Sequence, residues 1–459
     1  MLPKSSTKTH KQKNLFYGSL FDMLDLSDPL IALADAIDWF LLEKEFAGYY
    51  SDEGRPAKPI RLMVGLLLLK QLKNLSDEEI VLQWKQNPYF QYFCGESEFQ
   101  ITQPCHSTEL VKFRQRIGKS GVEKIFAMSV KLHGVDAEEK QVIIDTTVQE
   151  KNITYPTDGK LAIKMIHHLH KIAKEESLQL RRTYVREIKE HRLNLRFFKH
   201  PKKIKKARAS IKRLRTIVGI LIRDISRLLS QEQLEKYQEK FDLFEKVRKQ
   251  QTKDTNKVLS LHEQHVYAIT KGKDHKKYEY GTKASIVTTK KSGVIIGVAA
   301  HSKNEHDSKT LEAAFNSANK TRETPIQEAI CDRGYRGVKE VLGTQISIPG
   351  NPLKRDTEYQ KHNKREKFKR RAAIEPIIGH LKSDYGLSRN YLKGFIGDEI
   401  NLLLVATAWN LKKWMNLYFF AVLSKNFNLV FQAVAQFQTN YEILLQLLVI
   451  KMIFATKKF

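Results

Sequence analysis

The sequence predicts a mixed α/β protein, and two observations support this. Over residues 1–135, and again over about 158–258, apolar residues recur every three or four positions, which is the repeat of an α-helix. Between and after these stretches, short runs rich in β-branched residues indicate strands. The chain has 459 residues, 41% of them hydrophobic. It is therefore long enough for about three domains with their own cores, and a wholly disordered chain is excluded.

The charge balance is strongly basic. The chain has 79 Lys and Arg residues against 51 Asp and Glu residues, a formal net charge of +28. This excess predicts a polyanionic partner, and double-stranded DNA is the first candidate. Three scattered cysteines without C-x-x-C spacing indicate neither a disulfide scaffold nor a zinc module, and they fit a reducing cytoplasm. No apolar run reaches the ~20 uncharged residues of a membrane span, so we expect no membrane partner.

Residues 1–135 are predicted to form a helical N-terminal DNA-binding domain. The segment SDEE at 76–79 has the residue types of a helix start. The segment 107–116 begins another helix, with basic residues on one side. Small helices that present Lys and Arg are a common means of holding a DNA duplex.

The first strand is predicted in the run VIIDTTVQEKNIT, inside a first core segment at 136–160. Residues 161–258 then predict a basic helical insertion between the first and second core strands. Its stretch 196–215 holds ten Lys and Arg residues and no acidic residue. A solvated helix face is the simpler explanation, but uncompensated charge at this density favours DNA. The predicted DNA contacts here are Lys202, Lys203, Lys205, Lys206 and Arg208.

Residues 259–415 are predicted to complete the core, and 416–459 to form an apolar helical tail. Two β-rich runs within 282–304 predict a hairpin, and a short strand over 327–331 ends at Asp332. Between them, Asp307 precedes an apolar helix and is interpreted as its N-cap. The alternative is that Glu305 and Asp307 assist at a metal site, which requires their loop to fold over it. A second basic run leads into a helix that holds Glu375.

Three acidic residues carry the predicted chemistry. Asp145 interrupts an apolar strand, Asp332 ends another, and Glu375 lies on the helix that follows. A carboxylate at such a position is costly to desolvate unless a cation compensates it. Oxygen ligands suit Mg²⁺ or Mn²⁺, and two such ions support phosphodiester chemistry. We therefore predict that the three acids are both catalytic and metal-ligating.

Cations surround the third and second acids in the sequence. Phe368, Arg371, Glu375 and Lys382 form the pattern F-x2-R-x3-E-x6-K. Positions four and seven apart share a helix face, so Arg371 and Lys382 are predicted to hold a scissile phosphate beside the carboxylate. The further predicted DNA contacts are Arg333, Tyr335, Arg336, Lys369 and Arg370. For Tyr335, a buried position in the core is an equal alternative.

With these residues the chain resembles the DDE transposases of the bacterial IS4/IS5 superfamily, and it is most similar to IS5-type insertion-sequence transposases. The pattern around Glu375 matches the third-acid signature Y-x2-R-x3-E-x6-K, with Phe368 in place of the usual Tyr. The segments DRGY at 332–335 and IDTT at 144–147 match the second and first acids. The likeness runs from about residue 15 to about residue 415. The basic helical insertion and the apolar tail depart from better-known relatives.

The resemblance implies an RNase H-like catalytic core, with Asp145 on the first strand, Asp332 after the fourth and Glu375 on a later helix. It also implies a transposase that uses Mg²⁺ or Mn²⁺, as two ions, to cut the ends of an insertion sequence and join them to target DNA. Terminal inverted repeats and target DNA would be its partners, a homodimer its active form, and the bacterial nucleoid its location. Two alternatives stay open: a non-catalytic DNA-binding protein, and a metal-dependent nuclease without strand transfer.

Overall fold

The N-terminal part of the chain is helical. The computed structural model describes residues 19–51, 53–54, 56–251, 254–273, 276–348, 350 and 352–424. The first helices pack around α4, which is buried along most of its length. They are α1 (Leu20–Met23), α2 (Pro29–Ala36), α3 (Trp39–Ala47), α4 (Ile60–Leu72), α5 (Asp77–Gln86), α6 (Pro88–Phe93) and α7 (Ser107–Lys131). The predicted helix start at 76–79 is confirmed, because Ser76 and Glu79 form a capping box at α5.

A mixed seven-stranded sheet follows, so the mixed α/β prediction is confirmed. Its order is β2-β3-β1-β5-β7-β6, and β4 pairs with β3. The pairs β1–β5 and β5–β7 are parallel, whereas β3 is antiparallel to each of its neighbours. The strands are β1 (Gln141–Glu150), β2 (Tyr267–Lys273), β3 (Lys276–Thr289), β4 (Ile295–His301), β5 (Glu328–Ile330), β6 (Glu340–Val341) and β7 (Thr344–Ser347).

The sequence predicted four of these strands, and the structure adds β2, β6 and β7. Asp332 consequently follows the fifth strand along the chain, not the fourth. The segment of β2 reads YAITKGK and its partner begins KKYEYG, so neither shows the apolar run that marked the other strands. The strands β6 and β7 have two and four residues, too few for a period to be visible.

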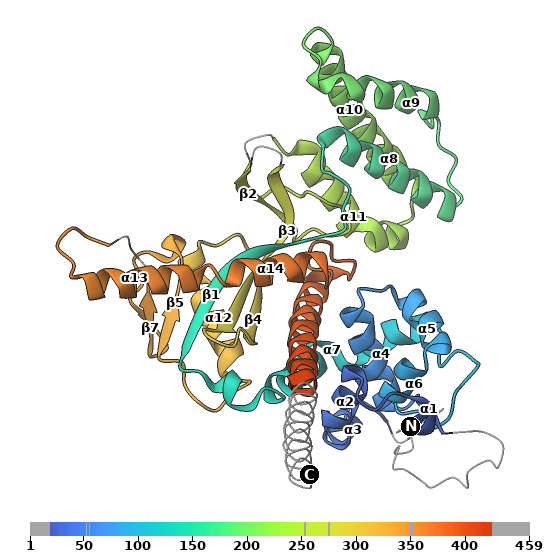
Figure 1. Cartoon of the computed structure of the whole chain (residues 1–459). Coiled ribbons are helices and arrows are strands. Elements are labelled where there is room, and N and C mark those ends of the chain that lie inside the picture. Colours follow the sequence, from blue (N-terminus) through green and yellow to red (C-terminus); the bar gives the residue numbers. More distant parts are fainter. Residues whose placement is uncertain are drawn as a thin grey trace, which may run out of the picture.

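Four helices lie between β1 and β2 and form a unit with its own apolar core. Figure 1 shows this unit extending away from the sheet beyond β2 and β3. The helix α10 is strongly amphipathic: its buried residues, such as Leu214, Ile217 and Leu221, follow the helical repeat, and its other faces carry basic residues. The four helices are α8 (Asp158–Glu175), α9 (Val185–Asn194), α10 (Ile204–Leu228) and α11 (Gln231–Lys249).

The two faces of the sheet carry different helices. On one face lie α13 (Glu358–Arg371) and α14 (Ile374–Ser383), which cross the sheet in Figure 1. The opposite face is covered by α12 (Leu311–Asn319), whereas a helix over residues 394–424 lies beside α14, with the Trp409 ring 6.0 Å from that of His380. The same apolar core includes α4 and α7, so it joins the N-terminal helices to the sheet.

The helix over 394–424 is tied to this core by polar contacts as well. The side-chain amide of Asn410 donates to the carbonyl of Ile295 (2.8 Å) and accepts from its N–H (2.9 Å). Asn410 thus replaces a strand partner where the β3–β4 register shifts. Its own carbonyl lies 3.0 Å from Nε2 of His133, which follows α7. The described part of the chain contains no helix with the length and apolar character to cross a bilayer. Most of the predicted apolar tail, from residue 425 on, lies outside the described residues.

Candidate active site and DNA-binding surfaces

The first two predicted acids belong to two neighbouring parallel strands: Asp145 lies in the middle of β1, and Asp332 comes just after the end of β5. In the register of β1 and β5, Ile143 pairs with Ile330. Asp145 and Asp332 each come two residues after this last pair, so the two acids stand at matching positions of neighbouring segments. Because side chains alternate along a strand, Asp145 lies on the same face of the sheet as Ile143.

The third acid begins over the same face. Ile374, next to Glu375, packs against Ile143 and Ile330 in a small buried cluster. Each member of this cluster stands one or two residues from one of the three acids. The Glu375 carboxylate itself is 60% exposed and accepts a hydrogen bond from Nη2 of Arg371 at 3.1 Å. The packing of Ile374 thus places Glu375 near the other two acids, while its carboxylate is hydrogen-bonded to Arg371.

Local hydrogen bonds orient the first two carboxylates. Oδ1 of Asp145 accepts from the N–H of Thr146 at 2.7 Å. Oδ1 of Asp332 accepts from the N–H of Gly334 at 2.8 Å and so caps the short 3₁₀ turn Arg333–Tyr335. Burial, and then the charges of Asp332 and Asp145, raise the pKa of the buried Cys331 thiol far above its usual value. Both carboxylates are therefore close enough to Cys331 to affect the pKa of its thiol, which agrees with the register of β1 and β5.

Tyr335 lies beneath the acids, inside the core. Its ring is 0% exposed, so the prediction that it contacts DNA is wrong and the core alternative holds. Burial, followed by the charges of Asp145, Asp307 and Asp332, raises the pKa of its hydroxyl well above the usual value. The hydroxyl has no hydrogen-bond partner within the described residues.

The cations around the third acid are more dispersed than the helical pattern predicted. Arg371 ends α13 and Lys382 lies near the end of α14, so the two do not stand on one continuous helix. Nζ of Lys382 lies 3.8 Å from Oε1 of Glu279 on β3. Arg370 is exposed and donates to the carbonyl of Lys291 at 2.8 Å. Three further predicted DNA contacts are exposed to solvent: Arg333, Arg336 and Lys369.

The predicted contacts of the helical insertion form a basic patch at the start of α10. The ammonium group of Lys203 lies 4.4 Å from the ring centroid of Phe197. Figure 1 shows that the insertion extends away from α14, so this patch is not part of the acid site. All five predicted residues are exposed: Lys202, Lys203, Lys205, Lys206 and Arg208.

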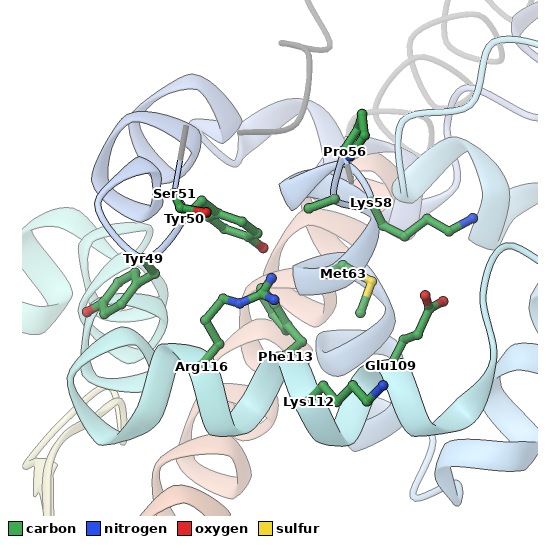
Figure 2. A pocket seen from close by; sticks show the side chains of 11 residues that line it. Tyr49, Tyr50, Ser51, Pro56, Lys58, Met63, Glu109, Lys112, Phe113 and Arg116 are labelled. Carbon is green, nitrogen blue, oxygen red and sulfur yellow. The ribbon is translucent and has the colours of Figure 1, made fainter. Parts of the chain in front are cut away.

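A cavity of about 610 Å³ opens in the N-terminal domain. Figure 2 shows Glu109, Lys112, Phe113 and Arg116 of α7 along one wall, with the segments 49–51 and 56–58 opposite. The guanidinium of Arg116 lies 4.6 Å from the ring centroid of Tyr50. Cationic and aromatic groups together suit nucleic acid. The basic side of α7 was predicted from the sequence. The position of segments 49–51 and 56–58 opposite it was not, because it depends on tertiary packing.

Comparison with known proteins decides the family. A model described as "Transposase domain (DUF772)" matches residues 18–116, and one described as "Transposase DDE domain" matches residues 248–411. The chain belongs to the DDE transposases. A curated relative, "Uncharacterized protein ORF8 in nfe locus" of Rhizobium meliloti, is 37% identical over 202 residues, which are 43% of this chain and 98% of that protein. No solved structure matches the chain significantly.

Both matches fall on parts of the transposase described above. The first covers α1 to α6 and the beginning of α7. The second begins near the end of α11 and includes Asp332 and Glu375, whereas Asp145 precedes it. The chain is therefore an enzyme that acts on DNA, and its family normally uses divalent metal ions.

The carboxylates of the three predicted acids suit such an ion chemically, but they do not all stand close together in this structure. Carboxylate oxygens are the ligands that Mg²⁺ and Mn²⁺ prefer, and Asp145 and Asp332 present them on adjacent strands. Within the described residues, no three His, Cys, Asp or Glu side chains stand close enough to hold a metal in this conformation. Glu375 would complete the set only after its carboxylate leaves Arg371.

The structure corrects the preferred interpretation of one further acid in this region, Asp307. Asp307 was interpreted as the N-cap of the apolar helix, but Thr310 is the residue that precedes α12, and Asp307 lies in a short 3₁₀ turn that His306 caps by accepting from the N–H of Ser308. The Asp307 carboxylate instead accepts from Oγ1 of Thr146 and from Nζ of Lys283, both at 2.9 Å. The cap interpretation is wrong. The contacts join three separate segments of chain, so no local pattern could have indicated them.

Proposed function

We propose that this transposase cuts DNA at the ends of an insertion sequence and transfers the resulting 3′-hydroxyl to target DNA. Asp145, Asp332 and Glu375 are its catalytic and metal-binding acids in this proposal. The observation that supports it most is the cluster of Ile143, Ile330 and Ile374, because each of these residues stands next to or two positions from one of the acids. A DNA-binding protein without catalysis has no need for such an arrangement.

The sheet supports an RNase H-like core. Its central order β3-β1-β5-β7 places the strand of the first acid between an antiparallel and a parallel neighbour. In this proposal the core comprises residues 136–160 and 259–415, the DNA-binding domain residues 1–135, and the basic insertion residues 161–258. The spacing F-x2-R-x3-E-x6-K supports the IS5 type.

Two Mg²⁺ or Mn²⁺ ions would supply the chemistry of the proposed reaction, by activating the attacking oxygen and stabilising the leaving one. The protein's own residues would bind these ions and orient the carboxylates. Asp145 and Asp332 are oriented by backbone N–H donors, which keeps their carboxylates on one edge of the sheet. Arg371 would exchange Glu375 for a DNA phosphate, which turns the third acid toward the other two.

The exposed cations would guide DNA to this edge. Arg333 and Arg336 follow the second acid, and the basic end of α13 precedes the third. The patch at the start of α10 and the cavity beside α7 would hold the duplex further from the cut. Two ends must meet in the reaction, so a homodimer is part of the proposal. Light scattering of the complex with an end fragment measures the number of subunits.

Cleavage of a labelled fragment that carries the end of the element tests the proposal. The wild type should nick at the element boundary in Mg²⁺ or Mn²⁺, whereas Asp332→Ala should bind the fragment and not cut it. Asp158→Asn is a matched control, because Asp158 forms an ion pair with Arg215 in the insertion, away from the acids. Joining of the cut end to a second DNA supports strand transfer. Cutting without joining indicates a nuclease, and equal cutting by Asp332→Ala contradicts the assigned acids.

A further inference from the structure

We propose that Asp307 is a positioning residue of this reaction, which ties the strand of the first acid to the turn of the second. The inference rests on the proposed roles of Asp145 and Asp332. Asp307 begins the short turn η3 (Asp307–Lys309) in the connection between β4 and α12. Its carboxylate is the only one in this connection for which the described contacts reach both acid-bearing segments.

One carboxylate oxygen of Asp307 holds two strands. Oδ1 accepts from Oγ1 of Thr146, the residue after the first acid on β1, and from Nζ of Lys283 on β3. Thr146 and Asp145 point to opposite faces of β1 because side chains alternate. Asp307 therefore holds β1 from the face opposite α14, directly behind the first acid.

The other oxygen faces the turn of the second acid. A Cβ on Gly334 would lie 3.0 Å from Oδ2 of Asp307 and 3.0 Å from Oδ1 of Asp332. The two oxygens are consequently at most twice that distance apart. Glycine is the one residue without a Cβ, so the DRGY turn can bring Asp332 this close to Asp307 without a steric conflict.

A buried phenol lies among the same acids. The Tyr335 ring is 0% exposed, its hydroxyl has no partner within the described residues, and its pKa responds to Asp145, Asp307 and Asp332 together. The Tyr335 ring is therefore buried where the segments of Asp145, Asp307 and Asp332 meet.

Lys283 supplies the counter-charge. Its side chain is 11% exposed, and its ammonium group also donates to the carbonyl of Glu305 at 2.6 Å. The lysine holds the carboxylate of Asp307 in place through Oδ1, while Oδ2 faces Gly334. The pair could also be purely structural, and the experiment separates that role from positioning through the charge on Asp307.

Three variants are compared with the wild type: Asp307→Asn, Lys283→Met, and the two together. Asp307→Asn retains the size of the side chain and its bond to Thr146 but removes the charge. Asp158→Asn is the control, since that carboxylate has a similar exposure (30% against 29%) and also forms an ion pair, with Arg215 at 2.8 Å. The measurements are the melting temperature, the affinity for Mn²⁺ by electron paramagnetic resonance, the affinity for the end fragment, and the nicking rate.

We expect Asp307→Asn to lower both Mn²⁺ affinity and nicking at least tenfold, within the 10- to 100-fold that loss of a group supporting a metal ligand costs. Its affinity for the end fragment should stay within twofold. The double variant should recover the melting temperature but neither the Mn²⁺ affinity nor the nicking rate. The proposal is overturned if Asp307→Asn keeps both within twofold, or if the double variant restores both. If the wild type binds Mn²⁺ but does not nick, the proposed function fails while the Mn²⁺ affinities still decide the role of Asp307.

Discussion

A buried ion-pair network at the end of β1 offers a sharp test of how the insertion is attached to the core. Lys151 follows β1, and its side chain is 3% exposed. Its Nζ lies 2.6 Å from Oδ1 of Asp398 on the helix over 394–424, and 3.5 Å from Oε2 of Glu263 in the segment before β2. The two carboxylates are 1% and 4% exposed. One ammonium group thus joins three segments inside the protein.

Lys151→Met keeps the length of the side chain and removes the charge. Two buried carboxylates then lose their shared cation, and the imidazole of His265, 2.9 Å from Oδ2 of Asp398, remains as the nearest basic group described. Removal of one partner from a buried pair costs about 3–5 kcal/mol, because the other charge stays desolvated. We therefore expect the free energy of unfolding to fall by about 3–5 kcal/mol.

Urea denaturation followed by circular dichroism measures this loss. The matched control is Lys171→Met, because Lys171 forms an exposed pair with Glu175 at 3.6 Å, and such a pair contributes only about 0–1 kcal/mol. Adding Asp398→Asn to Lys151→Met should recover part of the loss, since one uncompensated charge disappears. A loss below about 1 kcal/mol for Lys151→Met would refute the reasoning that this network is desolvated and mutually dependent.

Three further predictions concern packing, pH and salt. A Cβ on Gly281 would lie 1.9 Å from the carbonyl oxygen of Gln149, so Gly281→Ala should lower stability by at least about 1–3 kcal/mol in thermal melting, whereas Gly379→Ala, with open space around it, should not. Burial, and then the charge of Lys283, lower the pKa of His301. The unfolded chain therefore binds more protons below pH ~6.5, and urea midpoints should fall as the pH drops from 7.5 to 5.5, less so in His301→Gln. Neutralising the five basic residues of the α10 patch should reduce the salt slope of DNA binding by up to about 4.5, and an unchanged slope would show that the patch does not contact phosphates.

Local patterns predicted those parts of the fold whose stabilising contacts are themselves local. The helical repeat of residues 19–131 and the capping box at α5 were readable because a helix bonds within a few residues of itself. The strand around Asp145 and the strand before Asp332 were readable because each is apolar up to its acid. That these two strands pair in parallel was not predicted; the family resemblance implied only an RNase H-like core with one acid on the first strand and one after the fourth.

What sequence could not predict depends on contacts between distant segments. The helix face expected to hold Arg371 and Lys382 together is divided, because α13 and α14 are separate helices. Tyr335 was equally compatible with a surface and a core, since burial of one aromatic residue leaves no pattern. Asp307 was misread for a related reason: its neighbour His306 could also cap the turn, and its actual partners come from β1 and β3.

The three proposed acids differ in how firmly the structure holds them, and this difference orders the events of the reaction. Asp145 and Asp332 each follow the last pair of β1 with β5 by two residues, so this pairing holds their segments side by side. Glu375 is 60% exposed, and its bond to Arg371 is a surface ion pair, worth only about 0–1 kcal/mol. A DNA phosphate that binds the guanidinium can therefore release the carboxylate at little cost. In the proposed reaction the sheet would hold Asp145 and Asp332 in place, and DNA bound to Arg371 would free Glu375 to join them.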